Sequence, residues 1–437
     1  YLDALLSAFN EAYKEEGIQA VDANMEEYSN LAENGPYGYG PDVLYQANDI
    51  LMTYAEDKHI VALPVEDYEC YDKTPKEAWD AFKTISDGKE YYYGVPVNVQ
   101  EPMLFYREDM MPENWEKDWD DDKNGVADFF ENWTDLYAYS RLLRDSDKDG
   151  NSKYGFVASL NDFYMMAGFV FSYGGYVFGT NSDGTVNTED IGLGAGNAAT
   201  GLLAMKQFAG LMGKECIDDS VKTSRYSNVA NGTYFCSVST PDTYVLFHER
   251  LKEVYAGEGL GDEEAEKKAA ENLKMIELPK LLPADGDLSK DSSTMSGSDW
   301  VSNVVMGGIN GYGISAYTKN REACEKFVKF ATSFDMVKKR AELLGIAPTR
   351  SDASKDAGGV ADAIFGSLNE GSIYLMPSVK AVDQIWDPVQ TLFGDVAKDA
   401  FRAKDGETVK YKNEADMKAA LEKASKNIYD AIYVLAK

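Results

Sequence analysis

The sequence predicts an α/β fold with open, mostly parallel sheets and helices on both faces. Short apolar segments of strand character alternate with segments of helical periodicity along much of the chain, and this alternation is typical of such sheets. With 437 residues, the chain is also long enough for two or three domains, each with its own buried core.

The N-terminal part shows the alternation most clearly. Apolar residues recur at helical spacing from Leu2 to Tyr13, and Gly17 follows as a stop signal. A proline near the first turn favours a second helix. The elements expected here are helices over 2–13 and 75–85 and strands over 18–21, 41–45 and 91–99.

The remainder of the chain continues the pattern. Its apolar runs predict strands over 233–238 and 311–316, and residues 155–159 form a further apolar run. Helices are expected around 202–212, 321–333 and 336–344. A stripe of apolar residues from Met417 to Leu435 predicts a long amphipathic helix at the end of the chain.

The charge of the chain excludes some partners. It has 43 Lys and Arg against 74 Asp and Glu, a net charge of −31. Nucleic-acid binding needs clustered basic residues, and no basic stripe is present. An anionic membrane surface would repel the chain. No apolar run is long enough to span a bilayer.

Signals for catalysis are weak, so no catalytic residue is expected. The sequence has no GxSxG, HExxH or P-loop motif and only two His. Glycoside hydrolysis needs only two carboxylates, so an acidic glycoside hydrolase stays open as an alternative. The four Cys show no zinc-ligand spacing and are either free thiols or up to two disulfides.

Residues 120–131 match the twelve-residue calcium loop. Gly125 stands at position six, where the chain turns sharply, and oxygen-bearing side chains occupy ligand positions one, three, five, nine and twelve. The sequence therefore predicts structural calcium. The expected ligands are Asp120, Asp122, Asn124, Asp128 and Glu131.

A second acidic run repeats the first half of this pattern. It supplies Asp145, Asp147 and Asp149 as candidate calcium ligands, but Phe156 takes the place of the closing acid. Its remaining ligands would have to come from elsewhere in the fold.

Six segments in order resemble the extracellular solute-binding proteins of ABC importers, in particular the maltose-binding branch. They are residues 40–49, 94–97 with 104–109, 174–178, 231–241, 313–316 followed by 321–333, and 376–377 with Trp386. The resemblance implies a periplasmic-binding-protein-like fold with two α/β lobes joined by a hinge. Lobe 1 is expected at 1–98 and 279–331, and lobe 2 at 101–275 and 335–437, with the acidic loop near 118–131 as an insertion.

The resemblance also implies ligand contacts. Asp49 matches a carboxylate that accepts sugar hydroxyls, Asp162 and Tyr164 match an acid–x–Tyr pair, and Trp386 matches a stacking Trp. Elsewhere the chain departs from the family pattern, so the pocket is expected to be rebuilt. The departing positions are Gln46, Gln100 with its neighbour Glu101, and Asp242, for which Tyr244 is the expected substitute.

The function implied is that of a monomeric, non-enzymatic receptor. It would bind an oligosaccharide, preferably a maltooligosaccharide or α-glucan, in the cleft between the lobes and dock on an ABC permease in the membrane. It would be extracellular, either lipid-anchored or periplasmic, with a targeting segment that this sequence does not contain. The alternatives are a receptor for another oligosaccharide or a peptide, a glycoside hydrolase, and a calcium-dependent scaffold.

Overall fold

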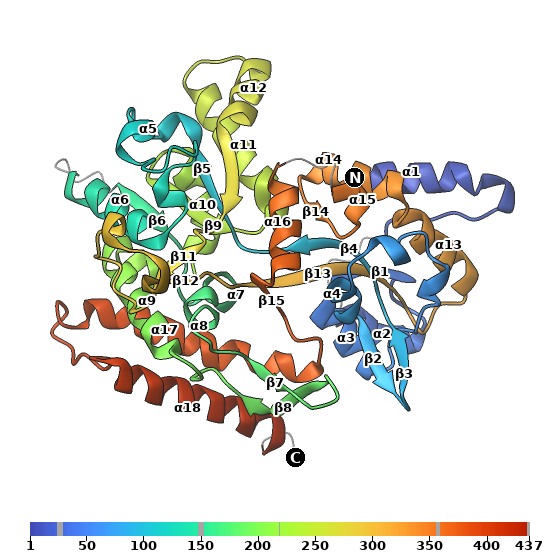
Figure 1. Cartoon of the computed structure of the whole chain (residues 1–437). Helices are drawn as coiled ribbons and strands as arrows, with labels where there is room; N and C mark the ends of the chain where they lie inside the picture. Colours follow the sequence, from blue (N-terminus) through green and yellow to red (C-terminus); the bar gives the residue numbers. More distant parts are fainter. Residues whose placement is uncertain (24–28, 147–152, 218, 355–358, 435–437) are drawn as a thin grey trace. The chain divides into compact units, whose positions relative to one another are not determined.

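The computed structural model describes residues 1–23, 29–146, 153–217, 219–354 and 359–434 (Figure 1). They form two compact units. Unit 1 comprises Tyr1–Glu101, Gly307–Gly371 and Leu375–Val382, and unit 2 comprises Pro102–Met306, Ser372–Tyr374 and Asp383–Lys437. Each unit combines helices with a sheet, which confirms the predicted α/β fold class.

Unit 1 is built on the strands β1, β13, β4 and β14, in this order in a five-stranded sheet; the fifth strand, β15, pairs with β13 and has its first two residues in unit 2. The strands are β1 (Val43–Ala47), β4 (Val95–Gln100), β13 (Val305–Ile314), β14 (Ala347–Pro348) and β15 (Ile373–Leu375), with a separate hairpin of β2 (Lys83–Ser86) and β3 (Lys89–Tyr92). The helices are α1 (Leu2–Ala12), α2 (Ser29–Asn34), α3 (Asn48–Glu56), α4 (Lys76–Asp80), α13 (Arg321–Ala331), α14 (Phe334–Leu344), α15 (Ser351–Ser354) and α16 (Gly359–Glu370).

The direction of the strands corrects one detail of the prediction. Strand β13 lies between β1 and β4 and runs antiparallel to both, and β14 is antiparallel to β4 (Figure 1). Neighbouring strands are therefore not mostly parallel, because the returning strand β13 separates the two strands that share a direction. As a result, β1 and β4 end at the same edge of the sheet.

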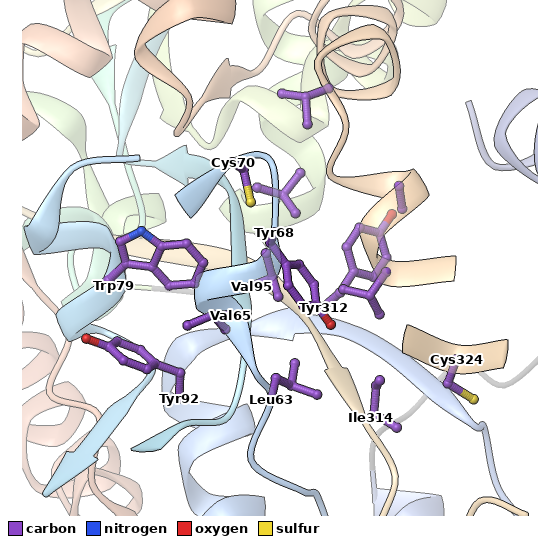
Figure 2. Packing of buried hydrophobic residues seen from close by; sticks show 14 of the residues in the cluster. Leu63, Val65, Tyr68, Cys70, Trp79, Tyr92, Val95, Tyr312, Ile314 and Cys324 are labelled. Atoms are coloured by element: carbon purple, nitrogen blue, oxygen red, sulfur yellow. The ribbon is translucent and has the colours of Figure 1, made fainter. Parts of the chain in front are cut away.

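The apolar core of unit 1 joins distant parts of the chain (Figure 2). Trp79 packs edge-on against Tyr92, with ring centroids 5.7 Å apart. Tyr312 and Ile314 of β13 and Cys324 of α13 belong to the same buried cluster. The segments before and after unit 2 in sequence thus share one core, and its burial stabilises unit 1.

The predicted lobe boundary at the C-terminal side is wrong. Residues 335–371 belong to unit 1 rather than to lobe 2. Val337 of α14 and Ala353 of α15 lie in the core described above. The buried Arg350 guanidinium also pairs with Glu69 at 2.9 Å. Apolar packing and this ion pair hold the segment in unit 1.

The predicted boundary near residue 279 is wrong as well. Residues 279–306 belong to unit 2 rather than to lobe 1. The Asn303 side chain donates to the Pro279 carbonyl at 3.0 Å, and the Ser172 hydroxyl donates to Asn303 Oδ1 at 3.1 Å. These polar contacts tie the segment to the rest of unit 2.

Unit 2 contains a four-stranded sheet with the order β10-β5-β9-β6, in which only β6 and β9 are parallel. The strands are β5 (Met103–Arg107), β6 (Tyr154–Val157), β9 (Tyr234–Ser239) and β10 (Leu273–Glu277), with hairpins of β7 (Phe178–Thr180) with β8 (Val186–Ile191) and of β11 (Leu281–Pro283) with β12 (Trp300–Ser302). The helices are α5 (Trp115–Asp118), α6 (Trp133–Ser146), α7 (Phe163–Met166), α8 (Gly168–Phe171), α9 (Ala198–Met212), α10 (Val221–Ala230), α11 (Tyr244–Gly257), α12 (Asp262–Asn272), α17 (Trp386–Arg402) and α18 (Glu414–Tyr433). Among the described residues, no helix is both long and apolar enough to cross a bilayer.

Close packing of α9 against α8 requires a glycine. A Cβ atom on Gly201 would lie 1.6 Å from the Phe169 carbonyl oxygen, which belongs to the backbone and cannot turn away. Gly210 lies on the same helix, is exposed and has nothing within 4 Å of such an atom.

We therefore expect Gly201→Ala to lower the free energy of unfolding by about 2 kcal/mol, because the two helices must move apart. The matched control Gly210→Ala should raise it by about 0.5–1 kcal/mol, since alanine favours a helix interior over glycine. Urea denaturation followed by circular dichroism measures both variants. Equal effects of the two variants would contradict this packing.

All four cysteines are buried and none is in a disulfide, which decides between the two states that the sequence left open. Burial raises the pKa of the Cys70 thiol to about 11 and that of Cys216 to about 12. The thiols are therefore protonated and unreactive at neutral pH while the protein is folded.

Candidate functional site

The predicted contacts of unit 1 lie at the edge of the sheet where β1 and β4 end. Gln46 is opposite Gly311 of β13, and Gln100 is opposite Gly308. Because these partners are three residues apart on one strand, the two glutamines approach the same edge. In open α/β sheets, ligands bind beyond the carboxyl ends of the strands, and this edge is such a place.

Two carboxylates accompany the glutamines. Asp49 lies in the first turn of α3, directly after β1, and is only 7% exposed. Glu101 follows β4 and is only 2% exposed. The structure thus brings Gln46, Asp49, Gln100 and Glu101 to one edge of unit 1.

Asn48 fixes the turn from β1 into α3. Its side chain donates to the Met376 carbonyl at 2.9 Å and to the Ser378 hydroxyl at 2.8 Å, and it accepts from the Ile309 N–H at 3.1 Å. These bonds set the direction of the first turn of α3, where Asp49 lies.

Asp162 and Tyr164 follow β6 in unit 2. Asp162 caps α7, and its Oδ1 accepts from the Met165 N–H at 3.3 Å. Burial raises the pKa of the Asp162 carboxyl, while the nearby Lys222 ammonium acts to lower it. Tyr164 is half-buried in the first turn of the same helix.

Trp386 is brought next to this loop by helix packing. It is the first residue of α17, and its ring centroid lies 6.3 Å from that of Phe163 on α7. The two rings are inclined by 63°, and Trp386 stays partly exposed. The predicted carboxylate, tyrosine and tryptophan of unit 2 therefore lie close together.

Asp242 and Tyr244 follow the neighbouring strand β9. Since β6 and β9 are parallel, the segments after both strands leave the same edge of the sheet. Tyr244 stacks on His248 with ring centroids 6.0 Å apart, and burial raises the pKa of its hydroxyl. Four of the predicted contacts of unit 2 thus follow strands at one edge of the sheet. The fifth, Trp386, packs against the loop after β6.

The acidic loop before α6 gathers several of the predicted calcium ligands. Asp120 accepts from the backbone N–H groups of Asn124, at 3.0 Å, and Gly125, at 3.1 Å. The Asn124 side-chain amide lies between Asp122, at 3.1 Å, and Glu131, at 2.6 Å. Gly125 has a φ of +83°, which favours glycine at this turn.

Asp128 completes this loop. Its Oδ2 accepts from the Asp121 N–H at 3.2 Å. Burial, assisted by the negative charges of Asp135, Asp121 and Glu131, raises the pKa of Asp128 to about 6. Excess negative charge has thus accumulated at this loop.

No group of three or more His, Cys, Asp and Glu side chains in the described part of the chain is arranged to hold a metal ion. The Asn124 amide lies between the carboxylates of Asp122 and Glu131 in this loop. In the second acidic run, Asp145 is exposed near the end of α6, and Asp147 and Asp149 lie outside the described residues.

Comparison with known proteins places the chain in a family. The profile of the bacterial extracellular solute-binding proteins matches residues 4–366. The chain belongs to this family. The predicted family resemblance is therefore confirmed.

Several curated relatives of this solute-binding protein are known. The galactooligosaccharide-binding protein of Bacillus subtilis is 24% identical over 377 residues, which cover 84% of this chain and 74% of the relative. The maltooligosaccharide ABC transporter solute-binding lipoprotein of Streptococcus pneumoniae serotype 4 is 22% identical over 372 residues, covering 84% and 73%.

Solved structures with the same fold support the architecture. The maltose-binding periplasmic protein MalE of Listeria monocytogenes, in complex with maltose, matches with a TM-score of 0.70 at 19% identity, covering 98% of this chain and 94% of that chain. MalX of Streptococcus pneumoniae, in complex with maltopentaose, matches with a TM-score of 0.69 at 18% identity, covering 98% and 97%. At these identities the likeness shows the fold of the solute-binding protein.

The sequence did not point to several polar residues around the predicted contacts. Asn48 orients the turn at Asp49, and Lys222, Asp219 and Asn161 surround Asp162. Lys222 and Asp219 are three residues apart, and this spacing predicts an ion pair on one helical turn. It does not predict that the pair lies beside the loop after β6.

Proposed function

We propose that this solute-binding protein is the oligosaccharide receptor of an ABC importer, with maltooligosaccharides or other α-glucans as preferred ligands. The observation that carries the proposal is the partly exposed ring of Trp386 beside the loop that bears Asp162 and Tyr164. An aromatic face next to a hydrogen-bond acceptor fits a pyranose ring, which is apolar on its faces and polar at its rim.

Each unit supplies polar groups suited to sugar hydroxyls. In unit 1 these are the carboxylates of Asp49 and Glu101 and the amides of Gln46 and Gln100. Ionised carboxylates make stronger hydrogen bonds than neutral acceptors. Binding requires no bond to be broken, so no catalytic residue is assigned.

In this proposal the protein acts outside the membrane as a monomer. It would be extracellular, lipid-anchored or periplasmic, and would deliver its sugar to an ABC permease. The Streptococcus pneumoniae relative is named a lipoprotein of such a transporter, which supports this arrangement. The high acidity of the chain, −31 in net charge, keeps it soluble and monomeric in this setting.

Calorimetric titration with purified oligosaccharides tests the ligand class. We expect saturable binding of maltotriose and maltopentaose to one site, with unchanged sugar recovered by chromatography. Binding of another oligosaccharide alone, for example a galactooligosaccharide as the name of the Bacillus relative suggests, would keep the receptor and reject the α-glucan preference. Cleaved sugar would instead favour a glycoside hydrolase, and no heat with any sugar would favour a peptide ligand.

We also propose that the acidic loop binds structural calcium. Asp122, Asn124 and Glu131 already meet at one point, and Asp120 lies beside them. These residues offer the hard oxygen ligands that calcium prefers, provided that Asn124 turns its amide oxygen inward. The cation would also relieve the repulsion that raises the pKa of Asp128.

Calcium is therefore expected to stabilise the folded protein by about 2 kcal/mol when it is well above its Kd, because it binds the folded state only. Thermal unfolding with calcium and with a chelator measures this effect. Glu131→Gln should remove most of it, whereas Asp118→Asn, an exposed neighbour outside the ligand set, should leave it intact. The same Tm with calcium and with chelator would refute the calcium site.

A further inference from the structure

A series of polar contacts surrounds the Asp162 loop in unit 2. The Ser159 hydroxyl donates to Asn161 Oδ1 at 2.5 Å, and Asn161 Nδ2 donates to Asp219 at 3.0 Å. Lys222 Nζ lies 3.0 Å from the same Asp219 carboxylate and 3.9 Å from Asp162 Oδ2. The loop after β6 is thereby fastened to the start of α10.

We propose that Lys222 is a positioning residue, whose ammonium group beside Asp162 Oδ2 directs this carboxylate for hydrogen bonding to sugar hydroxyls. This proposal rests on the proposed sugar-binding function. The two oxygens of Asp162 have separate tasks in this arrangement: Oδ1 caps α7, and Oδ2 faces the ammonium group of Lys222.

The charges around Asp162 make its ionisation sensitive to Lys222. Burial raises the pKa of Asp162, and Lys222 is the strongest of the groups that lower it, ahead of Arg225, while Asp219 raises it. Arg225 is buried and donates to the Val238 carbonyl at 2.8 Å, so β9 holds part of its guanidinium. The Lys222 side chain is about one third exposed and is held in place by Asp219.

The sign of the pH effect follows from these contacts. A buried carboxylate that loses a neighbouring cation becomes easier to protonate. Without Lys222, the pKa of Asp162 should rise, and Asp162 should lose its charge at a higher pH than in the native protein. The ionised carboxylate binds hydroxyls more strongly than the protonated one. As the pH is lowered, the variant should therefore begin to lose sugar affinity at a higher pH than the native protein does.

The variant Lys222→Met tests the first step without any ligand. Carbon-13 NMR of carboxyl-labelled aspartate, with the Asp162 signal assigned from Asp162→Asn, should show a higher pKa for Asp162 in Lys222→Met. The matched control Lys267→Met removes an exposed lysine on α12, whose side chain is 77% exposed, and should leave this pKa unchanged. Lys222→Arg should keep most of the native value. An unchanged pKa in Lys222→Met would overturn the proposal, even if no sugar binds.

Calorimetry with the best α-glucan tests the second step. At pH 5, Lys222→Met should bind about three- to tenfold more weakly than the native protein, with a smaller difference at pH 8. In the Asp162→Asn background, the same change should have no further effect. An equal loss in that background would show that Lys222 contacts the sugar itself, and would overturn the positioning role. Failure of every sugar to bind, with a shifted pKa, would reject the proposed function and retain the effect of Lys222 on Asp162.

Discussion

Replacing Asp399 by asparagine is expected to lower the free energy of unfolding by about 3 kcal/mol, since it breaks a buried ionic network. The Asp399 carboxylate is buried and accepts from Lys206 Nζ and from an Arg402 guanidinium nitrogen, each at 2.7 Å. It also accepts from the backbone N–H groups of Lys410, at 2.8 Å, and Tyr411, at 3.1 Å. An amide of the same shape retains part of these bonds, but it removes the carboxylate partner of Lys206 and leaves Arg402 paired only with Asp395 and the more distant Glu407.

The network connects three parts of unit 2. Helices α9, α17 and α18 lie against one another (Figure 1), and Asp399 joins α9 and α17 to the segment that leads into α18. Urea denaturation measures the loss. Glu253→Gln, which removes one charge of an exposed pair on α11, serves as the control and should change stability by less than about 0.5 kcal/mol. Similar losses in both variants would contradict a special role of the network.

The same carboxylate gives stability a defined dependence on pH. Burial acts to raise the pKa of Asp399, but hydrogen bonds from Lys206, Arg402 and two backbone N–H groups outweigh it and lower the pKa to about 2. Because this value lies below that of the unfolded chain, about 3.9, the native protein should lose about 2 kcal/mol as the pH falls from about 4 through 2. Asp399→Asn should lack this part of the acid sensitivity.

Trp386→Ala is expected to weaken oligosaccharide binding by about 2–3 kcal/mol, which is about 30- to 150-fold in Kd. The change removes an aromatic face from the loop that carries Asp162, while Phe163 keeps its contacts with Phe171 and Phe393. Trp386→Phe keeps a smaller aromatic face and should recover part of the affinity. Calorimetry with maltopentaose measures both variants.

Trp300 provides the control for this substitution. It is also partly exposed and lies in unit 2, but on β12 and outside the predicted contacts. Trp300→Ala should leave Kd within about twofold, an energy change below about 0.5 kcal/mol. Native affinity in Trp386→Ala would show that this tryptophan does not contact the sugar and would remove the main support for the proposed ligand.

Regular periodicity made the long helices predictable. The expected helices near 2–13, 321–333 and 336–344 and at the C-terminus correspond to α1, α13, α14 and α18. Short apolar runs were less reliable. The expected strand at 18–21 is absent because the Asn10 side chain donates to the Ala20 carbonyl and accepts from its N–H, at 2.9 and 2.7 Å, which ties this segment to α1.

The helix expected over 75–85 is also shorter than predicted. Helix α4 ends at Asp80, and Lys83–Ser86 forms β2, which pairs with β3. Strand pairing is a contact between segments, so the composition of one segment does not reveal it.

The candidate site shows the same limit. Its residues follow strands, and that position was readable from the sequence for Asp49, Asp162 and Asp242. The interactions that orient them were not, because they join remote segments: Asn48 bonds to Met376, and Lys222 approaches Asp162. Such contacts depend on the path of the whole chain and carry no local pattern.

The four buried thiols have a consequence in the extracellular setting that is proposed above. They are inert while they are enclosed, but each unfolding event exposes Cys70, Cys216, Cys236 and Cys324 together in surroundings that favour disulfides. A chain that is oxidised while unfolded carries disulfides that the native fold does not contain, so it cannot refold. Unfolding in an oxidising medium should therefore become irreversible with time. The lifetime of the folded protein should then be set by its rate of unfolding.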